Sequence, residues 1–163
     1  MEDRLYRLAE DVGAALKARA LKLATAESCT GGWIGEAITA VAGSSDWYER
    51  GFITYTDQSK REMLGVKAQT LKKFGAVSEP AVTEMAAGAL THSHARAAIA
   101  VSGIAGPTGG TSAKPVGTVC IAWSLGKGAV RAQTFHFPGD REAVRRQSVE
   151  RALAGLLEIL RTG

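Results

Sequence analysis

Apolar residues recur along this chain with a helical period in some segments and as continuous, strand-like runs in others. Near the N-terminus they repeat every three or four positions, which predicts an amphipathic helix over residues 3–19. Short apolar runs between turn residues predict strands over residues 21–27, 50–55 and 97–102. The other predicted helices cover residues 32–41, 58–64 and 68–74, a segment opened by Ser78-Glu79-Pro80, and a final segment after residues 138–140.

Two further strands are predicted over about residues 117–124 and 129–137, on either side of Gly126-Lys127-Gly128. This spacing is typical of a β-hairpin. Because helices and strands are mixed throughout, we expect a layered α/β sandwich in which the first strands run parallel through right-handed crossovers. The length of 163 residues suits one domain spanning 1–163 with a sizeable core.

Three hydroxyl-bearing residues lie at or near the carboxyl ends of predicted strands. They are Ser28, Tyr55 and Ser102, each in a different segment of the chain. In open α/β sheets, ligands bind beyond the carboxyl ends of the strands. We therefore expect these three side chains to point into one crevice.

A strand, a tight turn and a helix are predicted to meet in residues 25–32, TAESCTGG. This order gathers the Ser28 hydroxyl and unpaired backbone N–H groups at one helix start, which suits a nucleophile whose attack creates an oxyanion. The alternative is that Ser28 or Thr30 caps the helix. The motif is not the G-x-S-x-G elbow of hydrolases, because Ala26 stands where the first glycine would be.

Lys60 is the second candidate for chemistry, in the first turn of a helix that Asp57 can cap. The positive end of a helix and burial both lower the pKa of an amine, and a neutral lysine can act as a base. Tyr55 lies just upstream and could share a hydrogen bond with Lys60. A lysine that activates a serine is a known variant of the catalytic triad. The alternative is a solvated surface lysine.

A glycine-rich loop over residues 102–111 could bring backbone N–H groups close to a ligand, or could be a plain surface loop. It has neither P-loop nor G-x-G-x-x-G spacing. At the start of the last helix, Arg141 suits a phosphate or carboxylate, and Asp140 is expected as the cap. Three more arginines of this helix are expected on a solvated face: Arg145, Arg146 and Arg151.

Cys29 competes with Ser28 as a nucleophile. A cysteine nucleophile usually needs a nearby histidine. The three histidines lie in segments that we do not expect at the crevice: His92, His94 and His136. We therefore expect Cys29 to be a packing residue. No cysteine–histidine spacing suits a zinc site, and no metal is expected.

Composition limits the partners of the chain. A formal net charge of +4 fits an anionic small ligand, a weak attraction to nucleic acid, or no specific partner. The chain has no basic run interleaved with aromatics that would predict dedicated nucleic-acid binding. No apolar run is long enough to span a membrane, and the N-terminus lacks the layout of a signal peptide, so we expect a cytoplasmic protein. We expect a homo-oligomer, with a dimer as its simplest form.

Seven sequence blocks, in order, resemble the C-terminal domain of the competence-damage protein family, CinA, from about residue 5 to residue 160. The blocks are TAESCTGG (25–32), RGFITY (50–55), Lys60 with MLGV (63–66), GAVSEP (75–80), GIAGP (103–107), KPVGTV (114–119) and GDR (139–141). The chain departs from the family pattern at three positions, where threonine, asparagine and glycine are common: Ser102, Asp57 and Thr108.

The resemblance implies both a fold and an activity. The fold is a three-layer α/β/α sandwich with a mixed, mainly parallel central sheet. Free-standing members of the family are nicotinamide-nucleotide amidohydrolases, which implies deamidation of nicotinamide mononucleotide to nicotinate mononucleotide with release of ammonia, within pyridine-nucleotide salvage. It implies no cofactor and no metal.

The resemblance also implies roles for particular residues. Ser28 would be the nucleophile, activated by Lys60 together with Tyr55. The implied substrate-binding residues are Thr30, Gly31 and Gly32, around which backbone N–H groups would hold the oxyanion, then Ser102, Gly103 and Gly106 in the glycine-rich loop, and Arg141.

Two other functions stay open at this point. The chain could be a nucleotide-binding or protein-interaction module of the same family without catalysis, which would bind the mononucleotide and release no ammonia. It could also be a serine–lysine amidohydrolase that acts on a different amide, which a panel of amides would reveal.

Overall fold

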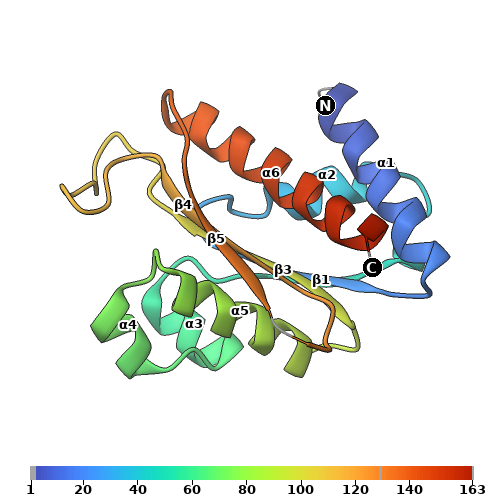
Figure 1. Cartoon of the computed structure of the whole chain (residues 1–163), viewed down its shortest axis with the longest axis horizontal. Helices are drawn as coiled ribbons and strands as arrows, with labels where there is room; N and C mark the ends of the chain where they lie inside the picture. The colour runs from blue at the N-terminus through green and yellow to red at the C-terminus, as the bar shows by residue number, and fades with distance from the viewer. Residues whose placement is uncertain (1–2, 129, 163) are drawn as a thin grey trace.

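The computed structural model describes residues 3–128 and 130–162 and arranges them in three layers (Figure 1). The central sheet has the strand order β2-β1-β3-β4-β5. Its strands are β1 (Leu23–Glu27), β2 (Tyr48–Ile53), β3 (Ala97–Gly103), β4 (Thr118–Ser124) and β5 (Arg131–His136). β1 pairs in parallel with β2 and β3, whereas β4 pairs antiparallel with β3 and β5. The predicted α/β fold with a mixed sheet is therefore confirmed, and β4 runs against the other described strands.

Helices cover both faces of the sheet (Figure 1). One face carries α1 (Asp3–Ala18), α2 (Trp33–Thr39) and α6 (Arg141–Thr162), and the other carries α3 (Asp57–Leu64), α4 (Ala68–Phe74) and α5 (Glu79–Thr91). A 3₁₀ turn, η1 (Ser44–Asp46), leads into β2. Within the described ranges, no helix combines the length and the hydropathy that a membrane span needs.

Each face of the sheet buries its own apolar core, because β1, β3 and β4 are buried along nearly their whole length. Branched side chains such as Ile99 and Val101 point to the α1–α2–α6 side. Their neighbours Ala98 and Ala100 point to the α5 side, where small side chains let the helix lie close to the sheet. Continuous apolar runs are what strands covered on both faces require.

Several observed elements begin or end a few residues from the predicted bounds. β2 covers Tyr48–Ile53 rather than 50–55, because its only neighbour in the described sheet, β1, pairs Leu23 with Tyr48 and Glu27 with Ile53. The predicted hairpin is confirmed by the antiparallel pairing of β4 with β5. Its second strand was predicted to begin at residue 129, which lies outside the described residues.

Thr56 is the N-cap of α3, so the prediction that Asp57 caps this helix is wrong. The Thr56 hydroxyl accepts a hydrogen bond from the Ser59 backbone N–H at 3.1 Å, and the Thr56 N–H donates to the Ser59 hydroxyl at 3.0 Å. This reciprocal pair is a capping box, which needs two suitable side chains three residues apart. Asp57 becomes the first helical residue, and its carboxylate lines the cavity described below.

Candidate active site

Ser28 lies directly beyond the carboxyl end of β1, between the ends of β2 and β3. Its backbone N–H donates to the Val101 carbonyl of β3 at 3.0 Å, which ties the turn to the sheet. The residue is only 7% exposed. Tyr55 and Ser102 line the same cavity as Ser28, as their strand-end positions predicted.

Lys60 meets Ser28 although 32 residues separate them in the chain. Its Nζ lies 3.0 Å from Ser28 Oγ and donates to the Thr54 carbonyl at 2.9 Å. The residue is 1% exposed, so the alternative of a solvated surface lysine is wrong. The first turn of α3, fixed by the Thr56 cap, aims Lys60 at the turn that follows β1.

Burial lowers the pKa of the Lys60 amine, because a charged ammonium loses its hydration there. The Asp57 carboxylate acts in the opposite direction, since it favours the protonated form. The first effect is the larger. A neutral Lys60 has a lone pair on Nζ that can accept the Ser28 proton across the 3.0 Å contact.

Neither Ser28 nor Thr30 caps the following helix. The N-cap of α2 is Gly32, whose φ of 102° is in the left-handed region that favours glycine, and no side chain caps it. The Thr30 hydroxyl donates instead to Glu27 Oε1 at 2.6 Å. Glu27 also accepts the backbone N–H groups of Ile34 and Gly35, so its carboxylate satisfies the start of α2.

Some backbone N–H groups near Ser28 donate hydrogen bonds within the protein, and others do not. The Gly31 N–H donates to the Ser28 carbonyl at 3.0 Å and is used to close the turn. For the N–H groups of Cys29, Thr30 and Gly32, no acceptor in another residue is found within the part of the chain that the structure describes. Of these three residues Cys29 lines the cavity, and unpaired backbone N–H groups are suitable donors to an oxyanion.

Arg141, the first residue of α6, reaches across the site to Tyr55. Its Nη2 donates to the Tyr55 hydroxyl at 3.0 Å, and its Nη1 donates to the Gly106 carbonyl at 2.7 Å. Tyr55 is 59% exposed and makes no hydrogen bond to Lys60 or Ser28 in this structure. The predicted Tyr55–Lys60 hydrogen bond is therefore replaced by a contact between Tyr55 and Arg141.

A cavity of about 300 Å³ joins these groups. The predicted residues that line it are Ser28, Lys60, Tyr55, Ser102, Gly103, Gly106 and Arg141, together with Cys29, Asp57, Ala76, Val77, Ile104, Ala105, Thr108 and Gly109. Three predicted binding residues are not among its lining residues: Thr30, Gly31 and Gly32. Asp57 is the cavity's one lining carboxylate among the residues described, opposite in charge to Lys60 and Arg141.

Sequence reasoning missed two residues that hold the Ser28 turn, Glu27 and Arg145. Arg145 is half-buried and donates to the carbonyls of Cys29 and Thr30, so its placement on a solvated face was wrong. A carboxylate within an apolar strand could have revealed Glu27. Arg145 lies one helical turn after Arg141, which was the only available signal.

Cys29 packs in the core beside Ser28, as predicted. Burial raises the pKa of its thiol to about 12, so the thiolate that would be the nucleophile is not formed at neutral pH.

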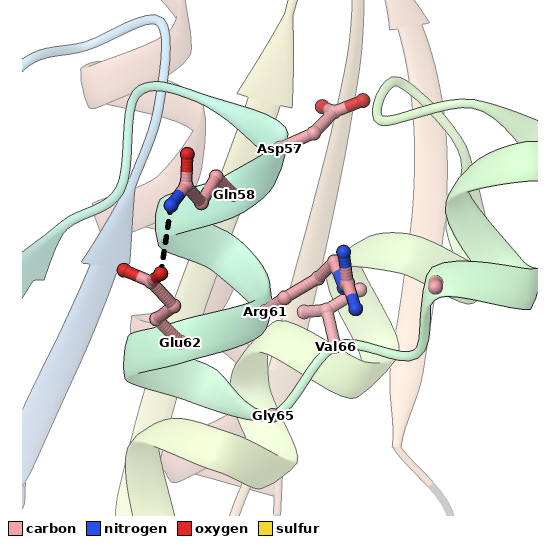
Figure 2. Close-up of a pocket in the computed structure, with 7 residues that line it drawn as sticks. Asp57, Gln58, Arg61, Glu62, Gly65 and Val66 are labelled. Atoms are coloured by element: carbon pink, nitrogen blue, oxygen red, sulfur yellow. Dashed lines mark hydrogen bonds between the residues drawn. The ribbon is translucent and has the colours of Figure 1, made fainter.

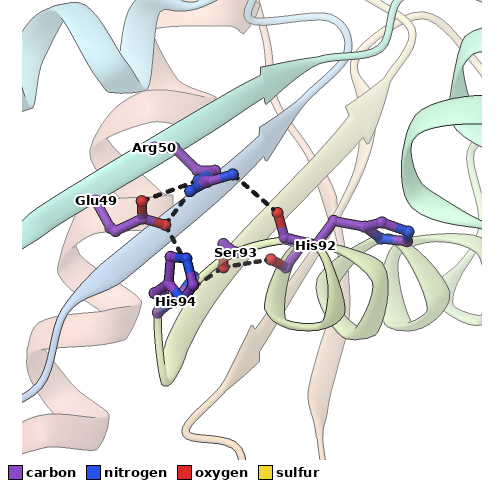
Figure 3. A network of polar contacts seen from close by, with 7 residues as sticks. Glu49, Arg50, His92, Ser93 and His94 are labelled. Atoms are coloured by element: carbon purple, nitrogen blue, oxygen red, sulfur yellow. Dashed lines mark hydrogen bonds and ion pairs between the residues drawn. The ribbon is translucent and has the colours of Figure 1, made fainter.

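The histidines lie away from this cavity, as predicted. His92 and His94 follow α5 near the amino end of β3, where Arg50 donates to the His92 carbonyl and the His94 N–H donates to Glu49 (Figure 3). Among the residues described, no three His, Cys, Asp or Glu side chains are grouped so that they could hold a metal ion.

A second hollow lies on the outer side of α3 (Figure 2). It is lined by Asp57, Gln58, Arg61, Glu62, Gly65, Val66 and Ala68. Gln58 and Glu62 hydrogen-bond to each other along the helix at 2.8 Å. The lining contains no hydroxyl, thiol or imidazole, so we assign it no covalent chemistry.

The fold and the site define a class: an α/β sandwich with a serine–lysine pair beyond the carboxyl ends of its parallel strands. Residues 5–160 match the sequence profile of the CinA C-terminal domain, and the chain belongs to this family. The resemblance seen in the sequence blocks is therefore confirmed.

Relatives in this family extend over nearly the whole chain. The chain is 52% identical over 155 residues to nicotinamide-nucleotide amidohydrolase PncC of Escherichia coli strain K12, covering 95% of this chain and 94% of that protein. It is 50% identical over 157 residues to the PncC of Pseudomonas putida, covering 96% and 98%.

Solved structures share the fold closely. Competence/damage inducible protein CihA from Agrobacterium tumefaciens has a TM-score of 0.94 at 42% identity, covering 98% of this chain and 97% of that one. A CinA superfamily protein from Klebsiella pneumoniae has a TM-score of 0.92 at 44% identity, covering 98% and 99%.

Proposed function

We propose that this protein is an amidohydrolase that converts nicotinamide mononucleotide to nicotinate mononucleotide and ammonia. The observation that carries the proposal is the 3.0 Å contact between Lys60 Nζ and Ser28 Oγ in a cavity at the strand ends. The names of relatives about half identical in sequence, nicotinamide-nucleotide amidohydrolases, support the choice of substrate.

In the first half of the proposed reaction, neutral Lys60 takes the Ser28 proton while Oγ bonds to the carboxamide carbon. The carbonyl electron pair moves to oxygen, where the proposed donors to the oxyanion are the N–H of Cys29, a residue that lines the cavity, and the N–H of the adjacent Thr30. The oxyanion then collapses, the C–N bond breaks, and the Lys60 ammonium returns its proton to the leaving nitrogen. Ammonia departs and an acyl ester on Ser28 remains.

In the second half, water attacks the ester carbonyl while neutral Lys60 takes a proton from the water. The second tetrahedral intermediate collapses, the Ser28 oxygen leaves and recovers its proton from Lys60, and nicotinate mononucleotide is released. The positive pyridinium ring withdraws electrons from the carbonyl in both steps. The carbonyl carbon is therefore more electrophilic, and the barrier to attack by Ser28 or by water is lower.

Arg141 is the proposed phosphate-binding residue. The contacts to Tyr55 and Gly106 use one N–H of each terminal guanidinium nitrogen. A guanidinium has five N–H donors, so three remain for an anion. Tyr55 would orient Arg141, and Ser102 and Gly103 line the same cavity as Arg141 and the nucleophile.

An ammonia-release assay with nicotinamide mononucleotide tests the proposal directly. We expect turnover by the natural chain and a loss of at least about 10³-fold in kcat for both Ser28→Ala and Lys60→Met, as for other activated-nucleophile sites. Circular dichroism and the thermal midpoint serve as folding controls. Cys29→Ala is the control for the thiol: it keeps the Cys29 backbone N–H of the proposed oxyanion site, removes only the neighbouring candidate nucleophile, and is expected to retain turnover.

Other outcomes would replace the proposal. Binding of the mononucleotide without ammonia release would favour a non-catalytic nucleotide-binding module. Turnover of another amide in preference to the mononucleotide would favour a different amidohydrolase. Full activity of the Ser28→Ala variant would remove the serine from the mechanism.

We also propose a cytoplasmic homodimer. β2 is an edge strand of the described sheet and carries the 54% exposed side chain of Ile53, and the open edge supports a contact with a second copy. Light scattering on the purified chain tests the dimer, and fractionation of cells that produce it tests its location.

A further inference from the structure

The guanidinium of Arg145 donates hydrogen bonds to the backbone of the turn that carries Ser28. Its Nε donates to the Cys29 carbonyl at 3.0 Å and its Nη2 donates to the Thr30 carbonyl at 3.2 Å. Its Cζ lies 5.4 Å from the centre of the Trp33 ring, so the ring supports the guanidinium from one side. One side chain of α6 thus holds two successive carbonyls that follow the nucleophile.

Arg145 does not line the cavity. Its contacts lie on the backbone behind Cys29, whereas Arg141, one turn earlier on α6, lies on the cavity wall. The two arginines therefore contact different parts of the site: Arg141 lines the cavity, and Arg145 binds the backbone of the turn.

Other contacts hold the rest of the turn. The Ser28 carbonyl accepts from the Gly31 N–H, and the Thr30 hydroxyl is bound by Glu27. The Thr30 carbonyl also accepts from the Trp33 N–H at 3.0 Å. For the Cys29 carbonyl, Arg145 is the one donor found within residues 3–128 and 130–162.

Peptide geometry connects the hydrogen bonds of Arg145 to the proposed oxyanion site. The Cys29 carbonyl and the Thr30 N–H belong to one planar trans peptide, so they point in opposite directions. With the carbonyl turned towards Arg145, the Thr30 N–H is turned away from it. A positive donor on the carbonyl also polarises the peptide and strengthens its N–H as a donor.

We propose that Arg145 is a positioning residue for catalysis: it fixes the peptide between Cys29 and Thr30 so that the turn presents Ser28 and its oxyanion donors in the reactive geometry. The proposal rests on the amidohydrolase function for its kinetic consequence. Lysine is not expected to replace this residue, because two separate guanidinium nitrogens, Nε and Nη2, bind the two carbonyls, and an ammonium has a single nitrogen.

The test compares Arg145→Met and Arg145→Lys with Arg151→Met. Arg151 is a matched control, because it is also half-buried on α6 with its guanidinium 5.6 Å from an aromatic ring, that of Phe135, but it does not contact the turn. We expect both Arg145 variants to lower kcat about 100-fold, with KM for nicotinamide mononucleotide within about twofold of the natural value. Arg151→Met is expected to keep both constants.

Hydrogen–deuterium exchange gives a readout that does not need turnover. We expect faster exchange over residues 28–35 in Arg145→Met and natural rates there in Arg151→Met. If the natural chain releases no ammonia, the proposed function fails, and the exchange result still decides whether Arg145 holds the turn. An unchanged kcat, a loss confined to KM, or unchanged exchange over residues 28–35 overturns the proposal.

Discussion

Burial and the Asp57 carboxylate are the two largest influences on the pKa of Lys60, and they act in opposite directions. Burial lowers the pKa of the amine and the Asp57 carboxylate raises it. Because the proposed base is the neutral amine, kcat/KM is expected to rise with pH through the pKa of Lys60 in the free enzyme. Asp57→Asn removes the group that favours the protonated form. We therefore expect the acid limb of the kcat/KM profile to move to lower pH in this variant.

Glu62→Gln is the control for this pH experiment. Glu62 lies on the same helix, makes the same carboxylate-to-amide change, and is directed away from Asp57, where it accepts from Gln58 (Figure 2). Its profile is expected to coincide with that of the natural chain. An acid limb that moves equally in both variants, or to higher pH in Asp57→Asn, would contradict the assignment of Lys60 as the base.

The local sequence predicted the two reactive side chains, Ser28 and Lys60, but not the side chains that hold the Ser28 turn in place. Ser28 and Lys60 were found because each lies at the start of a predicted helix next to a strand end. The sequence did not predict that Glu27 accepts the backbone N–H groups at the start of α2, since in the sequence it is only a single polar residue at the end of a strand. Arg145 was missed because its partners lie more than 100 residues earlier, and only the docking of α6 brings them together.

Helix α3 connects the local sequence to the catalytic pair, because its capping box begins the turn that carries Lys60. Thr56→Ala removes the hydroxyl that accepts the Ser59 N–H. We expect this change to lower the free energy of unfolding by about 1 kcal/mol. Chemical denaturation measures it.

Thr39→Ala is the control for Thr56→Ala, because it makes the same substitution at a threonine that caps no helix. Thr39 is an exposed threonine in α2 whose hydroxyl donates to the Gly35 carbonyl and caps no helix. Its replacement is expected to change stability by less than about 0.5 kcal/mol. Equal losses in the two variants would show that the capping box of α3 carries no special stability.

Element types followed from the sequence pattern, but element bounds depended on partners. The segment 68–74 was predicted with its observed limits, because Gly75 ends the helix locally. The strand at 50–55 was predicted two residues late, since apolar alternation does not reveal where β1 stops pairing. A hydrogen-bond ladder is a property of two segments, and the pattern of one segment cannot give its end.

Across the whole molecule, the sheet brings the site together by joining the ends of β1, β2 and β3, while α3 and α6 deliver Lys60 and Arg141 from opposite faces (Figure 1). The mixture of predicted helices and strands was sufficient for the layered fold. It could not give the strand order β2-β1-β3-β4-β5, because pairing between distant segments leaves no periodic signal in either. Because Lys60 and Arg141 come from helices on opposite faces of the sheet, their distances to Ser28 depend on how closely the helices of each face pack against the sheet and against one another.

Gly88 is where the α5 layer sets the position of α3. A Cβ at this glycine would overlap the backbone of Leu64, one helical turn beyond Lys60. Gly88→Ala must therefore move α3 away from α5, which shifts Lys60 relative to Ser28. We expect a loss of about 1–3 kcal/mol in the free energy of unfolding and a fall in kcat of about tenfold or more in the folded enzyme.

Ala87→Gly separates this displacement from a general loss of stability. Ala87 is the exposed neighbour on the same helix, and glycine there costs about 1 kcal/mol through helix propensity without touching Leu64. The two variants should be similarly destabilised in denaturation, while only Gly88→Ala loses kcat at a temperature where both are folded. If kcat followed stability equally in both variants, close packing of α5 on α3 would not control the distance between the amine and the hydroxyl.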